Sequence, residues 1–457
     1  MKPKPPTKLF GTDGIRAKAD EFPLDSTTVQ IIGASLARNL TERHGGKTPH
    51  IVVGRDTRES GPRIERELIA SARASGAAIE SAGVITTPGV AYLTRALKAH
   101  AGVVISASHN PYQDNGIKVF DPSGRKLDST TEARIEADIV AGRFAGLGSD
   151  VELQANELRK KELRTLYLDY LQFSVAGNLS PREVTMVIDC ANGAASQLAP
   201  ELFRRLGARV VAINNQPDGR NINLNCGSLH IEALQEAVVK EQADIGIAFD
   251  GDADRALFVD AAGNFVDGDA TMWVLANYLQ SRGQLEPQLV VSTVMTNLGL
   301  EVALRGRQIR LTRTDVGDKY VLDELLRSKG VLGGEQSGHI IFPDISLAGD
   351  GLITAIKVLR AMEDEHVSLG ELTKGFSRYP QVLLNVRVRE KVPFENVVAV
   401  KQKAEEVEHL LGNRGRLLLR YSGTEPLARV MIEGVDQNEV EALAEELAAV
   451  IKNEMGS

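Results

Sequence analysis

Short apolar runs typical of β-strands alternate with amphipathic helical segments along most of this chain. In the first such unit, strands at 51–53 and 103–105 enclose helices from Pro62 to Gly76 and around 92–98. Two further strand–helix–strand units follow, with segments at 184–188, 195–206 and 209–213, then at 289–292, 298–304 and 309–311. Because a helix between two strands favours parallel pairing, this repetition at roughly hundred-residue spacing predicts three similar α/β domains with mixed, mainly parallel sheets.

The last part of the chain has a different pattern. An alternating strand at 382–388 precedes a helix over 395–411, and strands at 416–420 and 429–433 precede a helix over 439–452. This order predicts a C-terminal α+β domain of about 80 residues, suited to close over a site.

A chain of 457 residues is too long for one hydrophobic core. We therefore expect four domains, at 1–150, 151–259, 260–376 and 377–457. Linkers are expected near 145–150, 260–267 and 376–380.

Composition and charge exclude several classes of protein. The net charge is −8 and no polybasic block is present, which argues against a general nucleic-acid binder. No apolar run approaches the length of a membrane span, and the first residues contain no signal core. Cys190 and Cys226 are too few for a metal cluster or a disulfide framework. A cytoplasmic enzyme acting on a small molecule is the expected class.

A loop rich in small and polar residues follows the apolar run 103–105. Its sequence, Ser106-Ala-Ser-His-Asn-Pro111, ends in an Asn-Pro pair that favours a turn. Such a loop places a serine hydroxyl at the end of a buried strand, where open α/β sheets bind ligands. Taken alone, the loop is better explained as a strand-to-loop junction with a capping serine, and only the other motifs favour catalysis.

A second loop carries three alternate carboxylates, Asp250, Asp252 and Asp254, between the apolar runs 245–249 and 256–259. Oxygen ligands that converge on one cation favour Mg²⁺ over zinc. An EF-hand is excluded, because Arg255 occupies the position that requires glycine. A solvated acidic turn is the alternative, but mutual repulsion between three acids flanked by apolar strands favours a bound cation.

Two further polar loops are candidate ligand sites. The segment 333–339 offers Glu335, Ser337 and His339, which suit sugar hydroxyls or an amine, although an ordinary turn explains it equally well. The segment 420–426, with Arg429 beyond it, can hold a dianionic phosphate, and a hairpin with exposed arginines is its alternative. The glycine–arginine clusters at 11–16 and 54–58 need be no more than salt-bridged turns. No nucleotide-binding glycine loop is present.

These motifs together make the chain resemble the α-D-phosphohexomutases, and within that superfamily the bacterial phosphoglucosamine mutase branch. The resemblance extends from Leu9 to about Lys452 and rests on motifs in the expected order: 10–16, 106–111 with 115–118, 250–255, 334–339 and 420–426. Gln336 and the segments 349–355 and 379–382 resemble the glucosamine branch. Ala253, Asp315 and Lys319 depart from the usual pattern, and the last two leave fine specificity open.

The resemblance implies four domains around a central cleft and a role for each motif. Ser108 would carry a phosphoryl group, and Asp250, Asp252 and Asp254 would bind Mg²⁺ together with an oxygen on Ser108. Arg16, Lys118 and His339 would give electrostatic or proton-transfer help. The residues implied to bind substrate are Glu335 and Ser337 for the sugar, and Arg420, Ser422, Gly423, Thr424 and Arg429 for its non-reacting phosphate.

The implied reaction interconverts glucosamine 6-phosphate and glucosamine 1-phosphate through a 1,6-bisphosphate, and it feeds UDP-N-acetylglucosamine synthesis. Glucosamine or glucose 1,6-bisphosphate would serve as the phosphorylating primer, and a homodimer is the expected assembly. Three alternatives stay open: a phosphomannomutase/phosphoglucomutase of the same superfamily, a phosphatase that uses Asp250 as an aspartyl-phosphate carrier, and a non-catalytic sugar-phosphate sensor.

Overall fold

The computed structural model describes residues 8–143, 156–422 and 425–456. The chain divides into two compact units: unit 1 comprises residues 1–291 and 314–373, and unit 2 comprises 292–313 and 374–457. The chain passes from one unit to the other within β11 (Leu289–Thr293) and returns within β12 (Arg310–Thr314). Within the described residues, no helix is both long enough and apolar enough to cross a membrane.

The first sheet of unit 1 has the strand order β1-β5-β4-β2-β3. Its strands are β1 (Ile15–Lys18), β2 (His50–Arg55), β3 (Ala78–Val84), β4 (Ala101–Ile105) and β5 (Asp114–Phe120). β2 is parallel to β3 and β4, whereas β5 is antiparallel to β4 and β1 is antiparallel to β5. The sheet is therefore mixed, with its parallel strands grouped together.

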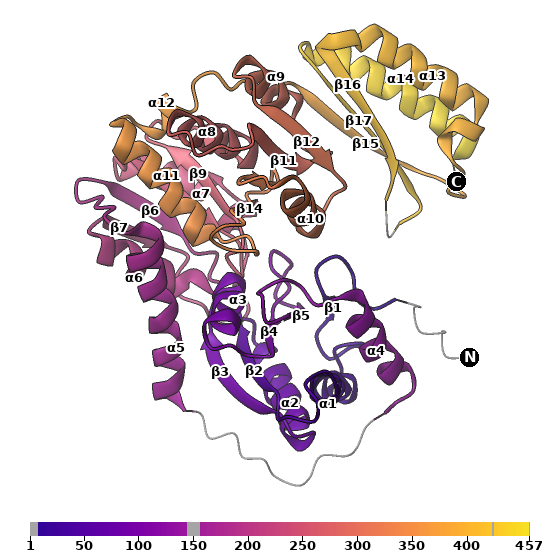
Figure 1. Cartoon of the computed structure of the whole chain (residues 1–457). Helices are drawn as coiled ribbons and strands as arrows, with labels where there is room; N and C mark the ends of the chain where they lie inside the picture. The colour runs from indigo at the N-terminus through magenta and orange to yellow at the C-terminus, as the bar shows by residue number, and fades with distance from the viewer. Residues whose placement is uncertain (1–7, 144–155, 423–424, 457) are drawn as a thin grey trace. The chain divides into compact units, whose positions relative to one another are not determined.

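Helices cover both faces of this sheet, as Figure 1 shows, which explains why its central strand β4 is apolar and buried at every position. The helices are α1 (Ser26–Arg43), α2 (Gly61–Ala74), α3 (Thr87–Ala96) and α4 (Ser129–Val140). Ile51 and Val53 belong to a core that α1, α2 and α4 also supply. α3 contacts β2 and β4. It starts at Thr87, earlier than expected, because Thr86 caps it and Pro88 occupies its first turn.

A second sheet in unit 1 repeats this plan with the order β10-β9-β8-β6-β7. Its strands are β6 (Thr185–Asp189), β7 (Arg209–Ile213), β8 (Ile245–Phe249), β9 (Ala256–Asp260) and β10 (Phe265–Val266). β6 is parallel to β7 and β8, and β9 and β10 continue antiparallel. Its accompanying helices are α5 (Glu157–Asp169) with the π-helical η1 (Tyr170–Ala176), α6 (Ala195–Leu206), η2 (Gly227–Leu229) and α7 (Glu232–Lys240).

The expectation of a linker at 260–267 is wrong. This segment forms the β9–β10 hairpin, because Asp260 accepts hydrogen bonds from backbone N–H groups across the turn. Its last residue, Asp267, then caps α8 (Gly268–Ser281) by accepting a hydrogen bond from Ala270 N at 2.9 Å. The expected linker at 145–150 lies outside the described residues.

The rest of unit 1 contributes a short hairpin and three helices. β13 (Gly333–Gly334) and β14 (Ile340–Ile341) pair antiparallel around the turn 335–339. The helices are α10 (Asp318–Ser328), α11 (Gly351–Glu365) and α12 (Leu369–Leu372). Asp350 caps α11 by accepting hydrogen bonds from Leu352 N at 2.9 Å and Ile353 N at 3.1 Å.

Unit 2 contains an antiparallel sheet, β15-β17-β16, with two long helices on one face (Figure 1). Its elements are α9 (Leu298–Gly306), β15 (Gln381–Arg387), η3 (Phe394–Asn396), α13 (Val398–Leu411), η4 (Gly412–Arg414), β16 (Gly415–Tyr421), β17 (Leu427–Gly434) and α14 (Gln437–Met455). Val430 and Ile432 of β17 pack with Val440 and Leu447 of α14. The expected C-terminal strands and helices are therefore present.

Asp350 makes the stability of unit 1 depend on pH. It is 3% exposed and accepts a 2.6 Å hydrogen bond from the Tyr167 hydroxyl. Burial raises its pKa to about 6, so between about pH 4 and pH 6 the folded chain keeps a proton that the unfolded chain releases. Stability therefore falls as pH rises through this window, by up to about 3 kcal/mol.

Asp350→Asn keeps a capping oxygen but removes this titration. We expect the difference in unfolding temperature, variant minus parent, to be larger at pH 7.5 than at pH 4.5, because only the parent loses this contribution as pH rises. Calorimetry at the two pH values measures that difference. An unchanged difference across that range would contradict the assignment.

Candidate active site

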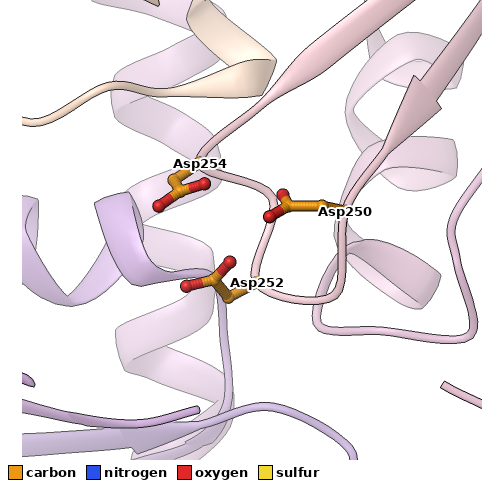
Figure 2. Close-up of side chains that lie close together, drawn as sticks. All are labelled: Asp250, Asp252 and Asp254. Atoms are coloured by element: carbon orange, nitrogen blue, oxygen red, sulfur yellow. The ribbon is translucent and has the colours of Figure 1, made fainter. Parts of the chain in front are cut away.

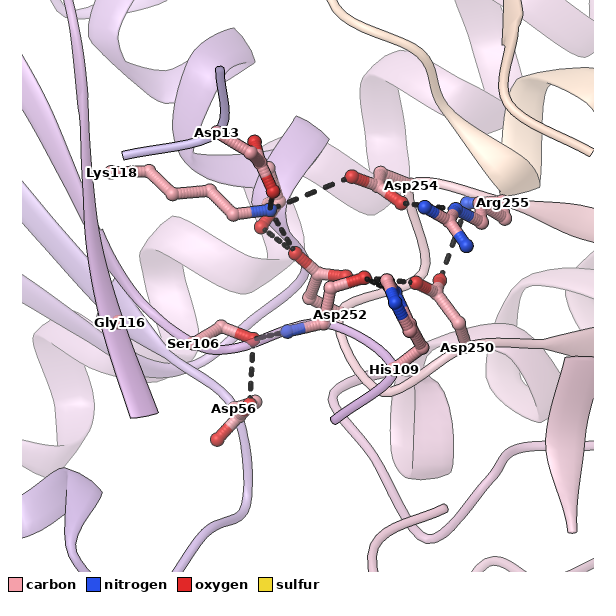
Figure 3. Close-up of polar contacts among 12 residues, drawn as sticks. Asp13, Asp56, Ser106, His109, Gly116, Lys118, Asp250, Asp252, Asp254 and Arg255 are labelled. Carbon is pink, nitrogen blue, oxygen red and sulfur yellow. Dashed lines mark hydrogen bonds and ion pairs between the residues drawn. The ribbon is translucent and has the colours of Figure 1, made fainter. Parts of the chain in front are cut away.

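The loop after β4 holds Ser108 in a backbone conformation that non-glycine residues rarely adopt, with φ at +51°. Hydrogen bonds fix both of its peptide groups. Its N–H donates to Ser106 Oγ at 2.9 Å, and its carbonyl accepts from Arg58 Nη2 and Asn223 Nδ2, each at 2.9 Å. Ser106 Oγ in turn donates to Asp56 Oδ2 at 2.6 Å (Figure 3). Ser106 therefore supports the loop, and Ser108 presents the hydroxyl.

Arg58 is a supporting residue that sequence reasoning missed. Its side chain is fully buried, and its guanidinium pairs with Asp56 at 2.8 Å. Its other N–H groups donate to backbone carbonyls of the serine loop, those of Ser108, Asn110, Pro111 and Asp114. The cluster 54–58 is therefore more than a salt-bridged turn. The available signal was an Asp between two arginines directly after a buried strand.

The three aspartates lie on the loop between β8 and β9, as Figure 2 shows. All three are buried, and each offers a carboxylate oxygen within 4.8 Å of the others. Among the described residues, Asp252 Oδ1 and Asp254 Oδ1 have no hydrogen-bond partner. These oxygens are therefore available to a cation.

The pKa values of Asp250 and Asp254 are both shifted, in opposite directions. Burial, with the charges of Asp254 and Asp252, raises the pKa of Asp250 well above its usual value. Burial also opposes ionisation of Asp254, but Lys118, His339 and Arg255 outweigh it and hold that pKa well below the usual range. Buried acids with unpartnered oxygens fit a hard divalent metal.

The serine loop and the aspartate loop meet directly (Figure 3). Ser108 Oγ donates to Asp250 Oδ2 at 2.6 Å, and Thr87 Oγ1 donates to Asp252 Oδ2 at the same distance. A Cβ added to Gly251 would lie 2.5 Å from the Ser108 carbonyl oxygen, so the close approach requires glycine. The carboxyl ends of β4 and β8 thus combine in one site.

Lys118, from β5, stands between the aspartates and the N-terminal loop. Its Nζ lies 2.8 Å from Asp252, 2.9 Å from Asp13 and 3.6 Å from Asp254. Burial lowers its pKa, but the three carboxylates outweigh that effect and leave the pKa well above its usual value. Lys118 is therefore a fixed positive charge.

Three other basic groups surround the site. Arg16 hydrogen bonds to Asn110 Oδ1 at 3.3 Å and pairs with Asp13. Burial lowers the pKa of His339, but Asp254 and other acids raise it to about 9 overall. Burial and nearby arginines lower the pKa of His109 to about 4, and its Nδ1 lies 3.2 Å from Ser108 Oγ. His109 is therefore neutral and contacts the serine hydroxyl.

A cavity of about 380 Å³ opens onto these groups within unit 1. Its lining includes Asp13, Arg16, Asp254, Arg255, Glu335 and His339. Glu335 Oε1 accepts a hydrogen bond from Gly317 N at 3.1 Å. Among the described residues, Ser337 Oγ is buried without a partner. The structure thus brings together the reacting-site candidates and Glu335.

The predicted phosphate loop lies in unit 2. Arg420 of β16 is the direct register partner of Arg429 of β17, and Arg429 Nη2 lies 3.4 Å from Ser422 Oγ. Burial and the charge of Arg429 lower the pKa of Arg420. Two cations paired across strands repel one another, which favours a bound anion. Gly423 and Thr424 lie outside the described residues.

Comparison with known proteins identifies the family. Consecutive segments match the domains described as Phosphoglucomutase/phosphomannomutase: alpha/beta/alpha domain I over 7–145, domain II over 165–263, domain III over 267–379, and the C-terminal domain over 383–450. The chain belongs to this family of enzymes. The predicted family and the predicted α/β fold class of four domains with mixed sheets are thereby confirmed, although each five-stranded sheet has as many antiparallel as parallel pairings.

Relatives and solved structures agree with this assignment. The phosphoglucosamine mutase of Solibacter usitatus is 51% identical over 98% of this chain and 99% of its own length. The phosphoglucosamine mutase of Chlamydia muridarum is 44% identical over 98% of this chain and 97% of its own length. A phosphoglucomutase/phosphomannomutase family protein from Burkholderia thailandensis has a TM-score of 0.78 at 24% identity, covering 98% of each chain. Aspergillus fumigatus N-acetylphosphoglucosamine mutase, solved with GlcNAc-6P and magnesium, has a TM-score of 0.67 at 18% identity, covering 98% of this chain and 96% of its own.

The buried contacts of Arg58 generate a test. Arg58→Met removes the donors to the serine loop and leaves Asp56 buried without its cation, so we expect it to lower the free energy of unfolding by about 3–5 kcal/mol. The measurement is chemical denaturation, with turnover assayed in parallel. Arg66→Met, at an exposed position of the adjacent helix α2, is the control. Equal stability of the two variants would contradict the role of Arg58.

Proposed function

We propose that this enzyme interconverts glucosamine 6-phosphate and glucosamine 1-phosphate, the phosphoglucosamine mutase reaction. Relatives with that name are 43–51% identical over nearly the whole chain. The observation that carries the chemistry is the Ser108 hydroxyl, 2.6 Å from a carboxylate of a buried aspartate triad. The alternative within the family, a phosphomannomutase/phosphoglucomutase, has less support.

In the proposed reaction, Ser108 carries a phosphoryl group on Oγ. The substrate's O1 hydroxyl attacks the phosphorus and loses its proton, the P–Oγ bond breaks, Oγ takes up a proton, and a 1,6-bisphosphate forms. After the bisphosphate reorients, Ser108 Oγ loses its proton and attacks the 6-phosphoryl group, the P–O6 bond breaks, O6 takes up a proton, and the phosphoenzyme is restored. Glucosamine or glucose 1,6-bisphosphate is the proposed primer for an unphosphorylated enzyme, and the product would feed UDP-N-acetylglucosamine synthesis.

Magnesium is the proposed metal. Asp250, Asp252 and Asp254 would hold it together with an oxygen on Ser108, since their carboxylate oxygens converge and oxygen donors favour Mg²⁺. When bound, it would neutralise charge on the transferring phosphoryl group. The magnesium in the Aspergillus fumigatus relative supports this choice.

The chain's own residues would position the reactants and offset their charge. Lys118, Arg16 and His339 would supply positive charge beside the phosphoryl oxygens, and Arg58 and Ser106 would hold the serine backbone. The proposed substrate contacts are Glu335 and Ser337 for the sugar, and Arg420, Ser422, Gly423, Thr424 and Arg429 for the other phosphate.

An aspartyl-phosphate phosphatase that uses Asp250 is less consistent with the site, because the Asp250 carboxylate accepts the Ser108 hydroxyl. A non-catalytic sensor would not require a serine whose N–H and carbonyl are both fixed by hydrogen bonds. The division into domains at 1–150, 151–259, 260–376 and 377–457, the cytoplasmic location and the homodimer stay predictions.

Removing the proposed phosphoryl carrier tests the scheme. Ser108→Ala should reduce mutase turnover by at least about a thousandfold, because no other step can begin without the phosphoserine. Mass spectrometry after incubation with glucose 1,6-bisphosphate and Mg²⁺ should find phosphate on Ser108 of the parent only. Ser123→Ala, at an exposed position of the same unit, is the control. Acyl phosphate on Asp250 would support the phosphatase instead.

Substrate choice is tested by comparing three 6-phosphates. The phosphorylated enzyme should turn over glucosamine 6-phosphate with a higher kcat/KM than glucose or mannose 6-phosphate, measured with the same primer and Mg²⁺. Preference for either neutral sugar would overturn the glucosamine assignment and leave the mutase chemistry intact.

A further inference from the structure

Lys126 lies outside every motif noted in the sequence, yet its ammonium group connects two segments that line the cavity: the Asp13 loop, and the Asp318 loop, which ends at Asp318, the first residue of α10. Its Nζ lies 2.7 Å from Asp13 Oδ1, 2.7 Å from Asp318 Oδ1 and 3.2 Å from the Thr12 carbonyl oxygen. These acceptors occupy all the donors of an ammonium group. Lys126 itself does not line the cavity, whereas Thr12, Asp13 and Asp318 do.

On one side, Lys126 supports the sugar-recognition turn. Asp318 follows Gly317, whose N–H donates to Glu335 Oε1 at 3.1 Å. Asp318 Oδ2 also lies 3.7 Å from His339 Nε2. A shift of Asp318 would therefore displace the amide that orients Glu335 and a charge that faces His339.

On the other side, Lys126 supports the reacting groups. Asp13 Oδ2 lies 2.9 Å from Lys118 Nζ and pairs with Arg16. Lys118 in turn contacts Asp252 of the triad. The position of Asp13 thus helps to set where Lys118 meets the aspartates.

These contacts close into a ring of alternating charge around the cavity. In order, its members are Asp254, His339, Asp318, Lys126, Asp13 and Lys118, and successive contacts measure 3.7, 3.7, 2.7, 2.7, 2.9 and 3.6 Å. Burial lowers the pKa of Lys126, but Asp318 and Asp13 outweigh it and leave that pKa raised. Lys126 therefore stays protonated within the ring.

A neighbouring ion pair offers a contrast. Arg125 pairs with Asp323 of α10 at 2.7 Å, but the side chains of this pair are 40% and 48% exposed, against 20% for each of Lys126 and Asp318. Exposed pairs of this kind contribute little. Arg125 also has no contact with Asp13, so it cannot transmit a shift to Lys118.

We propose that Lys126 is a positioning residue for phosphoryl transfer, whose ammonium group holds the Asp13 loop and the Asp318 loop at the spacing that the sugar phosphate requires. The expected effect of Lys126 on turnover rests on the proposed function. The expected effect of Lys126 on the positions of the two loops does not depend on it.

The test compares Lys126→Met, Lys126→Arg and the matched control Arg125→Met. Lys126→Met should lower kcat/KM for glucosamine 6-phosphate on the order of 10- to 100-fold. We expect KM to rise because Glu335, which is proposed to bind the sugar, is displaced, and kcat to fall because Lys118 is displaced from the aspartates. Lys126→Arg keeps the charge and should recover part of the loss. Arg125→Met should match the parent.

Hydrogen exchange of the segment 314–319 gives a readout that does not depend on turnover. Exchange should rise in Lys126→Met and stay at the parental level in Arg125→Met. Equal kinetics and equal exchange in these two variants would overturn the role of Lys126. If the parent failed to turn over glucosamine 6-phosphate, the proposed function would fail, and the exchange comparison would still decide the positioning role.

Discussion

The structure of unit 1 depends on placing several carboxylates in a small buried volume. Asp250, Asp252 and Asp254 lie within reach of one another there, and burial together with the charges of Asp254 and Asp252 raises the pKa of Asp250 well above its usual value. Isolated buried charges of this kind would cost several kcal/mol each, so they require partners. The surrounding chain supplies them from other elements: Lys118 from β5, Thr87 from the start of α3 and the Ser108 hydroxyl from the loop after β4.

This requirement explains why the two sheets of unit 1 meet at their strand ends. Neither loop is complete alone, because the serine loop supplies no carboxylates and the donors to Asp250 Oδ2 and Asp252 Oδ2 come from outside the aspartate loop. Gly251 permits the approach, since any side chain there would strike the Ser108 carbonyl oxygen. Burial then strengthens each contact, and the left-handed backbone of Ser108 is maintained by hydrogen bonds on both of its peptide groups.

Much of this could be predicted from the sequence, for identifiable reasons. Strand and helix periodicity is local, so β7 and α6 fall at the expected residues, 209–213 and 195–206. The aspartate triad was recognisable because its residues lie close together in the chain. The hairpin at 260–267 was mistaken for a linker, because polar turn residues look alike in both cases. The family is confirmed, whereas the individual site roles stay predictions.

The residues that sequence reasoning missed share one physical property. Arg58 and Lys126 are basic side chains with several partners far away in the chain: besides Asp56, Arg58 binds carbonyls of 108–114, and Lys126 binds Asp13 and Asp318. No periodicity or short motif encodes such pairing. A buried or half-buried cation satisfied by several directed acceptors contributes less to net stability than to geometry, because desolvation offsets most of its attraction. Phosphoryl transfer depends on geometry to within fractions of an ångström. Cations of this kind are therefore best sought where a basic side chain shielded from solvent has its acceptors on loops that also line the cavity.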